Sequence, residues 1–320
     1  TPRYMIVELL TGLLFVVVFV LYFVYGRGRF EMGPLIGLKA FNEGGWFFYV
    51  FHMILLTSLL VASAIDLELW VIPLSLCWFV TGVGFVGSAI GRVIVGTGPP
   101  DPLIIGFYKN FPKVDSAGIG ALAVGAAIGL FIALLLMWAG VIKRSYEEEN
   151  NDPEVETEER DYNHRLEAFK EIIFLLPIFI CAFAAYKLYN SVPVVTENWQ
   201  QMTKIPWVYG FLWSLWGYFV GCGIVWATRI LGTLGFGKEA MGLGDVHLMG
   251  AAGAFIGPIF VIIAFFVAPF FGLAWALYQM FFVKTRQIPY GPFLSLGVFT
   301  VMISHNFFRL YIYNYNLNMS

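Results

Sequence analysis

Long apolar stretches alternate with short polar or Gly/Pro-rich segments along the whole chain, and this alternation predicts a series of membrane helices. Most stretches are close to the roughly 20 residues that an α-helix needs to cross a bilayer. One stretch, which Gly257-Pro258 ends, is shorter, and we expect a brief helix or half-span there. The expected helices cover about 5–25, 46–65, 70–95, 117–142, 168–190, 207–234, 246–257, 259–283 and 292–313. The pattern therefore predicts an all-α, polytopic transmembrane helix bundle of about nine membrane segments.

Composition supports a membrane protein. Of the 320 residues 59% are hydrophobic and 12% are charged, which is more apolar surface than a soluble core hides. The net charge of −2 gives no reason to expect nucleic acid as a partner. Cys77, Cys181 and Cys222 lie in separate apolar stretches without C-x-x-C spacing. We therefore expect no bound metal and no cofactor.

One hydrophilic insertion interrupts the apolar pattern. We expect residues 1–320 to form one membrane-embedded unit, with an acidic loop at 143–166 inserted within it. The acidic run at 147–161 predicts a solvated loop, with a docking site for a basic partner as the alternative. Loops on the side of this insertion hold slightly more Lys and Arg than those on the other side, which favours a cytoplasmic location for them.

Two acids stand where an ordinary membrane helix carries none. Asp66 closes an apolar stretch, and Asp245 follows Gly-Leu-Gly between two others. An ionisable group in a bilayer costs about 2.5–3.5 kcal/mol, so such groups usually mark function. Four expected spans separate the two acids, which places both at the same membrane face. Two neighbouring carboxyl groups that share one proton can polarise a peptide carbonyl and deprotonate a water, so this pair predicts an aspartyl dyad.

The residues around the acids also have simpler interpretations. Gly242 and Gly244 permit a close approach of a peptide, or a positive φ before the acid. Alternatively, Asp245 caps a helix that begins near Val246, and Asp66 caps a helix that begins near Trp70.

Four segments resemble landmarks of the prepilin peptidases, in the same order: residues 3–12, 65–73, 237–249 and 288–294. These enzymes, the type IV leader peptidases, are intramembrane aspartyl proteases of the G-x-G-D kind. The resemblance implies cleavage of the leader from type IV prepilins or type II secretion pseudopilins, at the cytoplasmic face of a prokaryotic inner membrane. It implies Asp66 and Asp245 as the catalytic pair. It also implies pilus or secretion assembly components as partners, together with the lipid bilayer.

The chain departs from the family pattern near both acids. Glu68 and Leu74 stand where the family commonly has an aspartate and another acid, and His247 stands where it often has a lysine. A histidine facing the dyad would adjust the shared proton, whereas one facing away is a structural hydrogen bonder. The residues expected to bind substrate or support the acids are Gly242, Gly244, Glu68, Lys238, Glu239, His247, Glu8, Pro289 and Pro292. Lys238 and Glu239 either position the substrate or pair with each other.

Bifunctional members of that family carry a methylating region, often with zinc-binding C-x-x-C pairs, before the first landmark. No such region precedes Thr1 in this sequence, so we expect no N-methylation from these residues. Two other functions stay open: a proton- or cation-coupled transporter, since intramembrane carboxylates serve that purpose too, and a non-catalytic membrane subunit of a pilus or secretion assembly. We expect Arg229 to face the bundle or the interface, with no chemical task.

Overall fold

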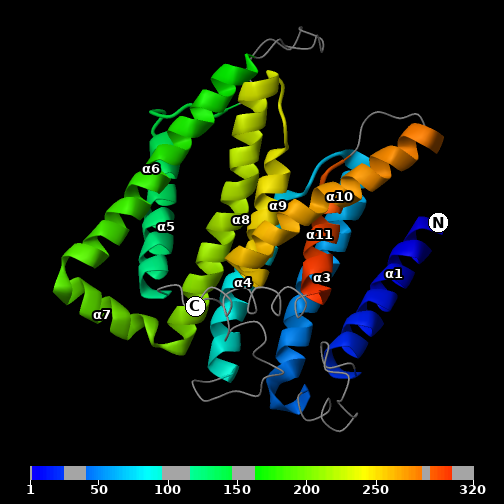
Figure 1. Ribbon diagram of the computed structural model, residues 1–320, viewed down its shortest axis with the longest axis horizontal. Coiled ribbons are helices and arrows are strands. Elements are labelled where there is room, and N and C mark those ends of the chain that lie inside the picture. Colours follow the sequence, from blue (N-terminus) through cyan, green and yellow to red (C-terminus); the bar gives the residue numbers. More distant parts are fainter. Residues whose placement is uncertain (1, 25–40, 96–115, 146–162, 283–288, 305–320) are drawn as a thin grey trace, which may run out of the picture.

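The chain folds as a bundle of helices of unequal length (Figure 1). A computed structural model describes residues 2–24, 41–95, 116–145, 163–282 and 289–304, and no strand occurs within these ranges. The helices are α1 (Pro2–Phe19), α3 (Trp46–Leu69), α4 (Leu74–Val95), α5 (Ser116–Trp138), α6 (His164–Ser191), α7 (Pro193–Thr203), α8 (Pro206–Phe236), α9 (Leu243–Ile256), α10 (Pro258–Phe282) and α11 (Gly291–Ile303). Two short π-helical turns, Val20–Val24 and Phe41–Gly45, end α1 and precede α3.

Each of the predicted apolar stretches contains a helix, so the polytopic helical bundle is confirmed. Within the described residues, seven helices are long and apolar enough to cross a membrane: α1 with its π-helical end, α3, α4, α5, α6, α8 and α10. The remaining apolar helices, α9 and α11, are shorter, as predicted for the segment that contains Gly257. Most of the acidic insertion, including 147–161, lies outside the described residues.

Helix α7 was not predicted, because its sequence, PVVTENWQQMT, is largely polar. Pro193 begins it, in the first turn where the missing N–H of proline costs nothing. The Trp199 Nε1–H donates to the carbonyl oxygen of Ala117 at 2.7 Å, which ties α7 to the start of α5. Helix α7 therefore closes the connection from α6 to α8 at the end of the bundle away from the G-x-G-D segment (Figure 1).

The short helix α9 is the centre of the core. It packs against α4, α8, α10 and α11, and nearly all of its side chains from Asp245 to Ile256 are buried. Gly217 of α8 and Gly253 of α9 bring the two backbones into direct contact, as small residues do between membrane helices. A helix surrounded on all sides holds its N-terminus in a fixed position, and this N-terminus carries Asp245.

Candidate active site

Asp66 lies on the last full turn of α3, with only 6% of its surface exposed. The helix does not end at residue 65, as the loss of hydrophobicity predicted, but continues to Leu69. The N–H of Trp70 donates to the carbonyl oxygen of Asp66 at 3.0 Å, and Trp70 closes the helix in the left-handed conformation, with φ at 57°. The interpretation of Asp66 as the cap of the following helix is therefore wrong.

Asp245 lies in the first turn of α9 and is 7% exposed. The N-cap is Gly242, so the helix begins at Leu243 and Asp245 is its third residue rather than its cap. The backbone amide of Gly242 hydrogen-bonds to the Asp245 carboxyl group, as in the reciprocal half of a capping box. A negative charge is also favourable at a helix N-terminus. Local helix geometry therefore supports Asp245 while its carboxyl group stays close to Asp66.

Three chain segments bring the acids together. The N–H of Gly291, at the start of α11, donates to Asp66 Oδ2 at 3.1 Å. Ile72, in the turn between α3 and α4, packs against both Gly244 and Gly291. Any Cβ on Gly291 would lie 2.6 Å from Asp66 Oδ2, and one on Gly244 would lie 2.9 Å from Ile72 Cβ. The starts of α9 and α11 thus reach the end of α3 only because both positions lack a side chain.

The two acids interact electrostatically. Burial raises the pKa of Asp245, and the charge of Asp66 raises it further, to about 7. The Gly242 amide and the Arg229 guanidinium act in the opposite direction. Burial, followed by the charge of Asp245, raises the pKa of Tyr290 to about 12. An acid–base pair requires one carboxyl group that keeps its proton near neutral pH and lies beside a second carboxyl group.

The predicted supporting residues divide into two groups. Pro289 and Pro292 flank Gly291 at the start of α11, and Gly242 and Gly244 precede Asp245 in the loop and first turn of α9. Exposed side chains form the other group, which comprises Glu8 on α1, Glu68 beside Asp66, and Lys238 between α8 and α9. The second group is not gathered into the buried site that the acids form.

Three of the sequence interpretations need correction. Gly242 has a φ of −72°, which any residue adopts, and the left-handed glycine of this loop is Gly237. Glu239 pairs with Arg229 of α8 at 2.5 Å rather than with Lys238. The ring of His247 lies against Trp78 of α4, with 5.8 Å between ring centroids. Because residues two apart point to nearly opposite sides of a helix, His247 faces away from the Asp245 carboxyl group.

Sequence reasoning missed two residues of the site. Gly291 was part of a landmark but was given no role, since its contact with Asp66 spans 225 residues of sequence. Arg229 was expected to face the bundle or the interface, and it is indeed buried in the bundle, 1% exposed, but its bonds to the segment just before Asp245 were not foreseen. A useful signal was available for Arg229, because a cation in an apolar stretch needs a buried acid, and Glu171 lies in the neighbouring apolar helix.

Comparison with known proteins finds relatives of this chain among prepilin-processing enzymes. Residues 172–277 match the model of the type IV leader peptidase family, and this range contains Asp245 but not Asp66. The prepilin leader peptidase/N-methyltransferase of Aeromonas hydrophila is 32% identical over 104 residues, which cover 31% of this chain and 34% of that protein. The type 4 prepilin-like proteins leader peptide-processing enzyme of Escherichia coli O78:H11 is 35% identical over 81 residues, which cover 25% of this chain and 29% of that protein.

No solved structure matches the chain. The matched segments span about a third of the length of the curated relatives. The family match at 172–277 contains the G-x-G-D segment, α8, α9 and most of α6 and α10. The resemblance to the prepilin peptidases is therefore confirmed, and of the four landmarks the one at 237–249 lies within the residues that match the type IV leader peptidase family, 172–277.

Proposed function

We propose that this multi-pass membrane protein is an aspartyl endopeptidase that removes the leader from type IV prepilins or type II secretion pseudopilins. The observation that carries the proposal is the meeting of two buried acids, Asp66 and Asp245, from helices separated by four candidate spans. Burial and the charge of Asp66 raise the pKa of Asp245, and acids with such strongly raised pKa values are concentrated at catalytic sites. Prepilin processing appears in the names of the relatives, which supports this choice of substrate.

The two acids have different roles in the proposed reaction. The N–H of Gly291 donates to Asp66, which favours the ionised form of this acid, and Asp245 keeps its proton up to about pH 7. Asp66 takes a proton from a water whose oxygen attacks the carbonyl carbon of the scissile peptide bond. Asp245 meanwhile donates a hydrogen bond to the carbonyl oxygen. The tetrahedral intermediate collapses when the leaving amine takes a proton from the pair, which regenerates the starting state.

The site is proposed to open to the cytoplasmic face of the inner membrane. Helix α6 begins and α8 ends at the same end of the bundle (Figure 1). This end carries Lys143, Arg144, Arg165, Lys170 and Lys238. Basic residues near helix ends favour the cytoplasmic side. Components of a pilus or secretion assembly are proposed as partners that receive the processed subunit.

Cleavage of a purified prepilin in detergent tests the proposal. Asp66→Asn and Asp245→Asn keep the size of each side chain but remove its acid, so we expect each to abolish cleavage. Glu197→Gln removes an exposed acid on α7 and is the matched control, for which we expect the wild-type rate. Full activity of either aspartate variant would exclude the dyad. Substrate-driven ion flux in liposomes without any cleavage would favour the transporter instead.

A further inference from the structure

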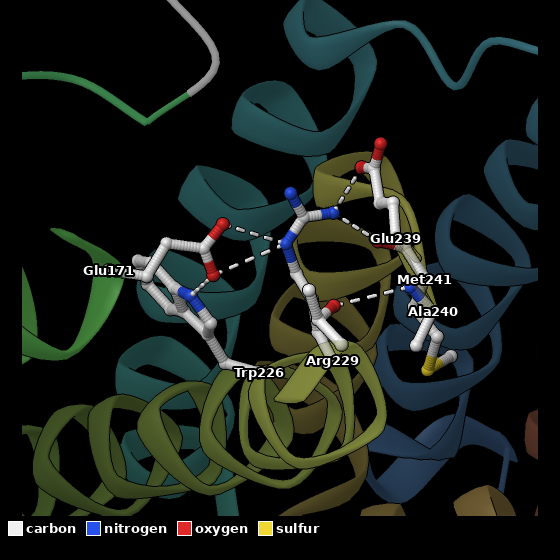
Figure 2. A network of polar contacts seen from close by, with 7 residues as sticks. Glu171, Trp226, Arg229, Glu239, Ala240 and Met241 are labelled. Carbon is white, nitrogen blue, oxygen red and sulfur yellow. Dashed lines mark hydrogen bonds and ion pairs between the residues drawn. The ribbon is translucent and has the colours of Figure 1, made fainter. Parts of the chain in front are cut away.

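A buried polar network connects α6, α8 and the segment that leads into α9, residues 237–242 (Figure 2). At its centre, the Arg229 Nε–H donates to both carboxylate oxygens of Glu171, at 2.9 and 3.2 Å. Trp226 Nε1–H also donates to Glu171, at 2.8 Å. On its other side, Arg229 Nη1–H donates to Glu239 Oε1 at 2.5 Å and to the carbonyl oxygen of Met241.

A second bond holds the same segment. The N–H of Ala240 donates to the hydroxyl of Thr233, one turn along α8 from Arg229. The 237–242 segment is thus bound to α8 at Glu239, Ala240 and Met241, immediately before the N-cap of α9 (Figure 2). Apart from these bonds, it contains exposed residues and the left-handed Gly237, which favour no single conformation by themselves.

Stability alone does not account for this network. Glu171 and Arg229 are both nearly fully buried, and replacing a buried ion pair by apolar residues of similar size is often neutral or stabilising. The guanidinium group offers donors in a rigid fork, so one residue holds an acid of α6 and a backbone carbonyl of the segment at the same time. This geometry suits a group whose task is to fix one chain segment relative to another.

We propose that Arg229, held by Glu171, is a positioning residue that fixes the 237–242 segment and thereby sets the place of Asp245 relative to Asp66. The inference rests on the proposed function, because it assigns a further residue to the same reaction. Arg229 does not touch the substrate in this account. It acts through Met241 and Glu239, which lie four and six residues before the acid.

The electrostatic environment of Asp245 supports the inference. The titratable groups that interact with it come from four elements: Asp66 from α3, Cys77 from α4, Tyr290 from the start of α11, and Arg229 from α8. Arg229 is the cation among these groups, and its charge lowers the pKa of Asp245. Loss of Arg229 is therefore expected to move the alkaline limb of the cleavage profile to higher pH. A defect of folding alone would lower cleavage equally at every pH.

Two variants test the inference. The double variant Arg229→Met/Glu171→Met removes the ion pair without leaving an unpaired buried charge, so we expect it to fold. Glu239→Ala breaks one arm of the network at a side chain that is 44% exposed, where a substitution disturbs folding little. Arg92→Met, which removes a cation stacked on Tyr209 near the end of α4, is the matched control.

Hydrogen–deuterium exchange of residues 237–242 and the steady-state kinetics of prepilin cleavage are measured for each variant. We expect faster exchange in both test variants. In the double variant we expect a kcat about 10- to 100-fold lower with an unchanged KM, the loss typical of a group displaced by about 1 Å. A smaller fall in kcat is expected for Glu239→Ala, and no change for the control.

Only faster exchange combined with a lower kcat supports the inference. Wild-type exchange in both test variants would overturn it, and so would faster exchange with an unchanged kcat. Exchange does not require activity, so Glu239→Ala still tests the anchoring if the double variant fails to fold. If the wild-type protein cleaves no prepilin, the proposed function fails, whereas the anchoring of residues 237–242 is still decided by exchange.

Discussion

Gly291 offers the sharpest test of the site, because its missing side chain leaves the space that Asp66 occupies. A Cβ at this position would lie 2.6 Å from Asp66 Oδ2, 3.3 Å from Asp66 Cγ and 3.1 Å from Ile72 Cδ1. Ordinary contact begins at 3.4 Å, so Gly291→Ala must displace the carboxyl group, or the start of α11, by about 0.8 Å (3.4 − 2.6). Buried Asp66 has little room for this shift, and the hydrogen bond from the Gly291 N–H opposes it.

A displacement of about 1 Å at a reacting group costs up to about 100-fold in rate. We therefore expect Gly291→Ala to lower kcat for prepilin cleavage by about 10- to 100-fold while the protein still inserts and folds. Gly223→Ala is the matched control, because a Cβ at Gly223 on α8 meets no atom within 4 Å. A Gly291→Ala protein that cleaves at the wild-type rate would show that Asp66 need not occupy its observed position, and would refute the assignment of Asp66 as the base.

Further predictions concern the neighbours of Asp245 and its titration. A Cβ on Gly242 would meet Asp245 Oδ2 at 3.7 Å and Gly244 N at 3.9 Å, both ordinary contacts, so Gly242→Ala should fold normally; a higher KM with unchanged kcat would indicate that substrate passes over this position. Cleavage should decline as pH rises above about 7, because Asp245 then loses the proton that polarises the carbonyl, and rates measured across the neutral range check this. His247→Gln should leave that pH profile unchanged, since His247 packs on Trp78; a shifted limb would restore its tuning role.

The sequence predicted the helices well because each apolar stretch must satisfy its backbone hydrogen bonds within itself in a membrane. It failed at their ends, where the polar Asp66 closed the apolar pattern but not the helix. It also missed α7, which binds to its neighbours through side chains such as Trp199 rather than through hydrophobic length. The pattern of apolar residues reflects which side chains are buried. A helix that is neither long nor apolar therefore cannot be predicted from that pattern.

The candidate site was predictable only in part, for a related reason. Asp66 and Asp245 are conspicuous because each is an acid in an apolar context, and the count of spans between them places them at one face. Contacts made by backbone groups do not depend on the residue type, so they cannot be recognised in the sequence. The Gly291 N–H reaches Asp66 across 225 residues, and Arg229 reaches the Met241 carbonyl, which any residue type at 241 would supply.

The raised pKa of Asp245 also implies that the ionised form of this acid lowers the stability of the folded protein. Its pKa is about 7 in the folded protein against an ordinary value of 3.8, so the folded state binds the proton more tightly than the unfolded state. Asp245 therefore costs no stability below about pH 4, and its cost grows as pH rises through the folded pKa of about 7. Asn cannot ionise, so Asp245→Asn should unfold at a higher temperature than the wild type at pH 8 and at a similar temperature at pH 4. An equal or lower unfolding temperature at pH 8 would mean that the ionised acid is well solvated or paired in the fold, and an Asp245 of that kind would not hold the proton that the reaction requires.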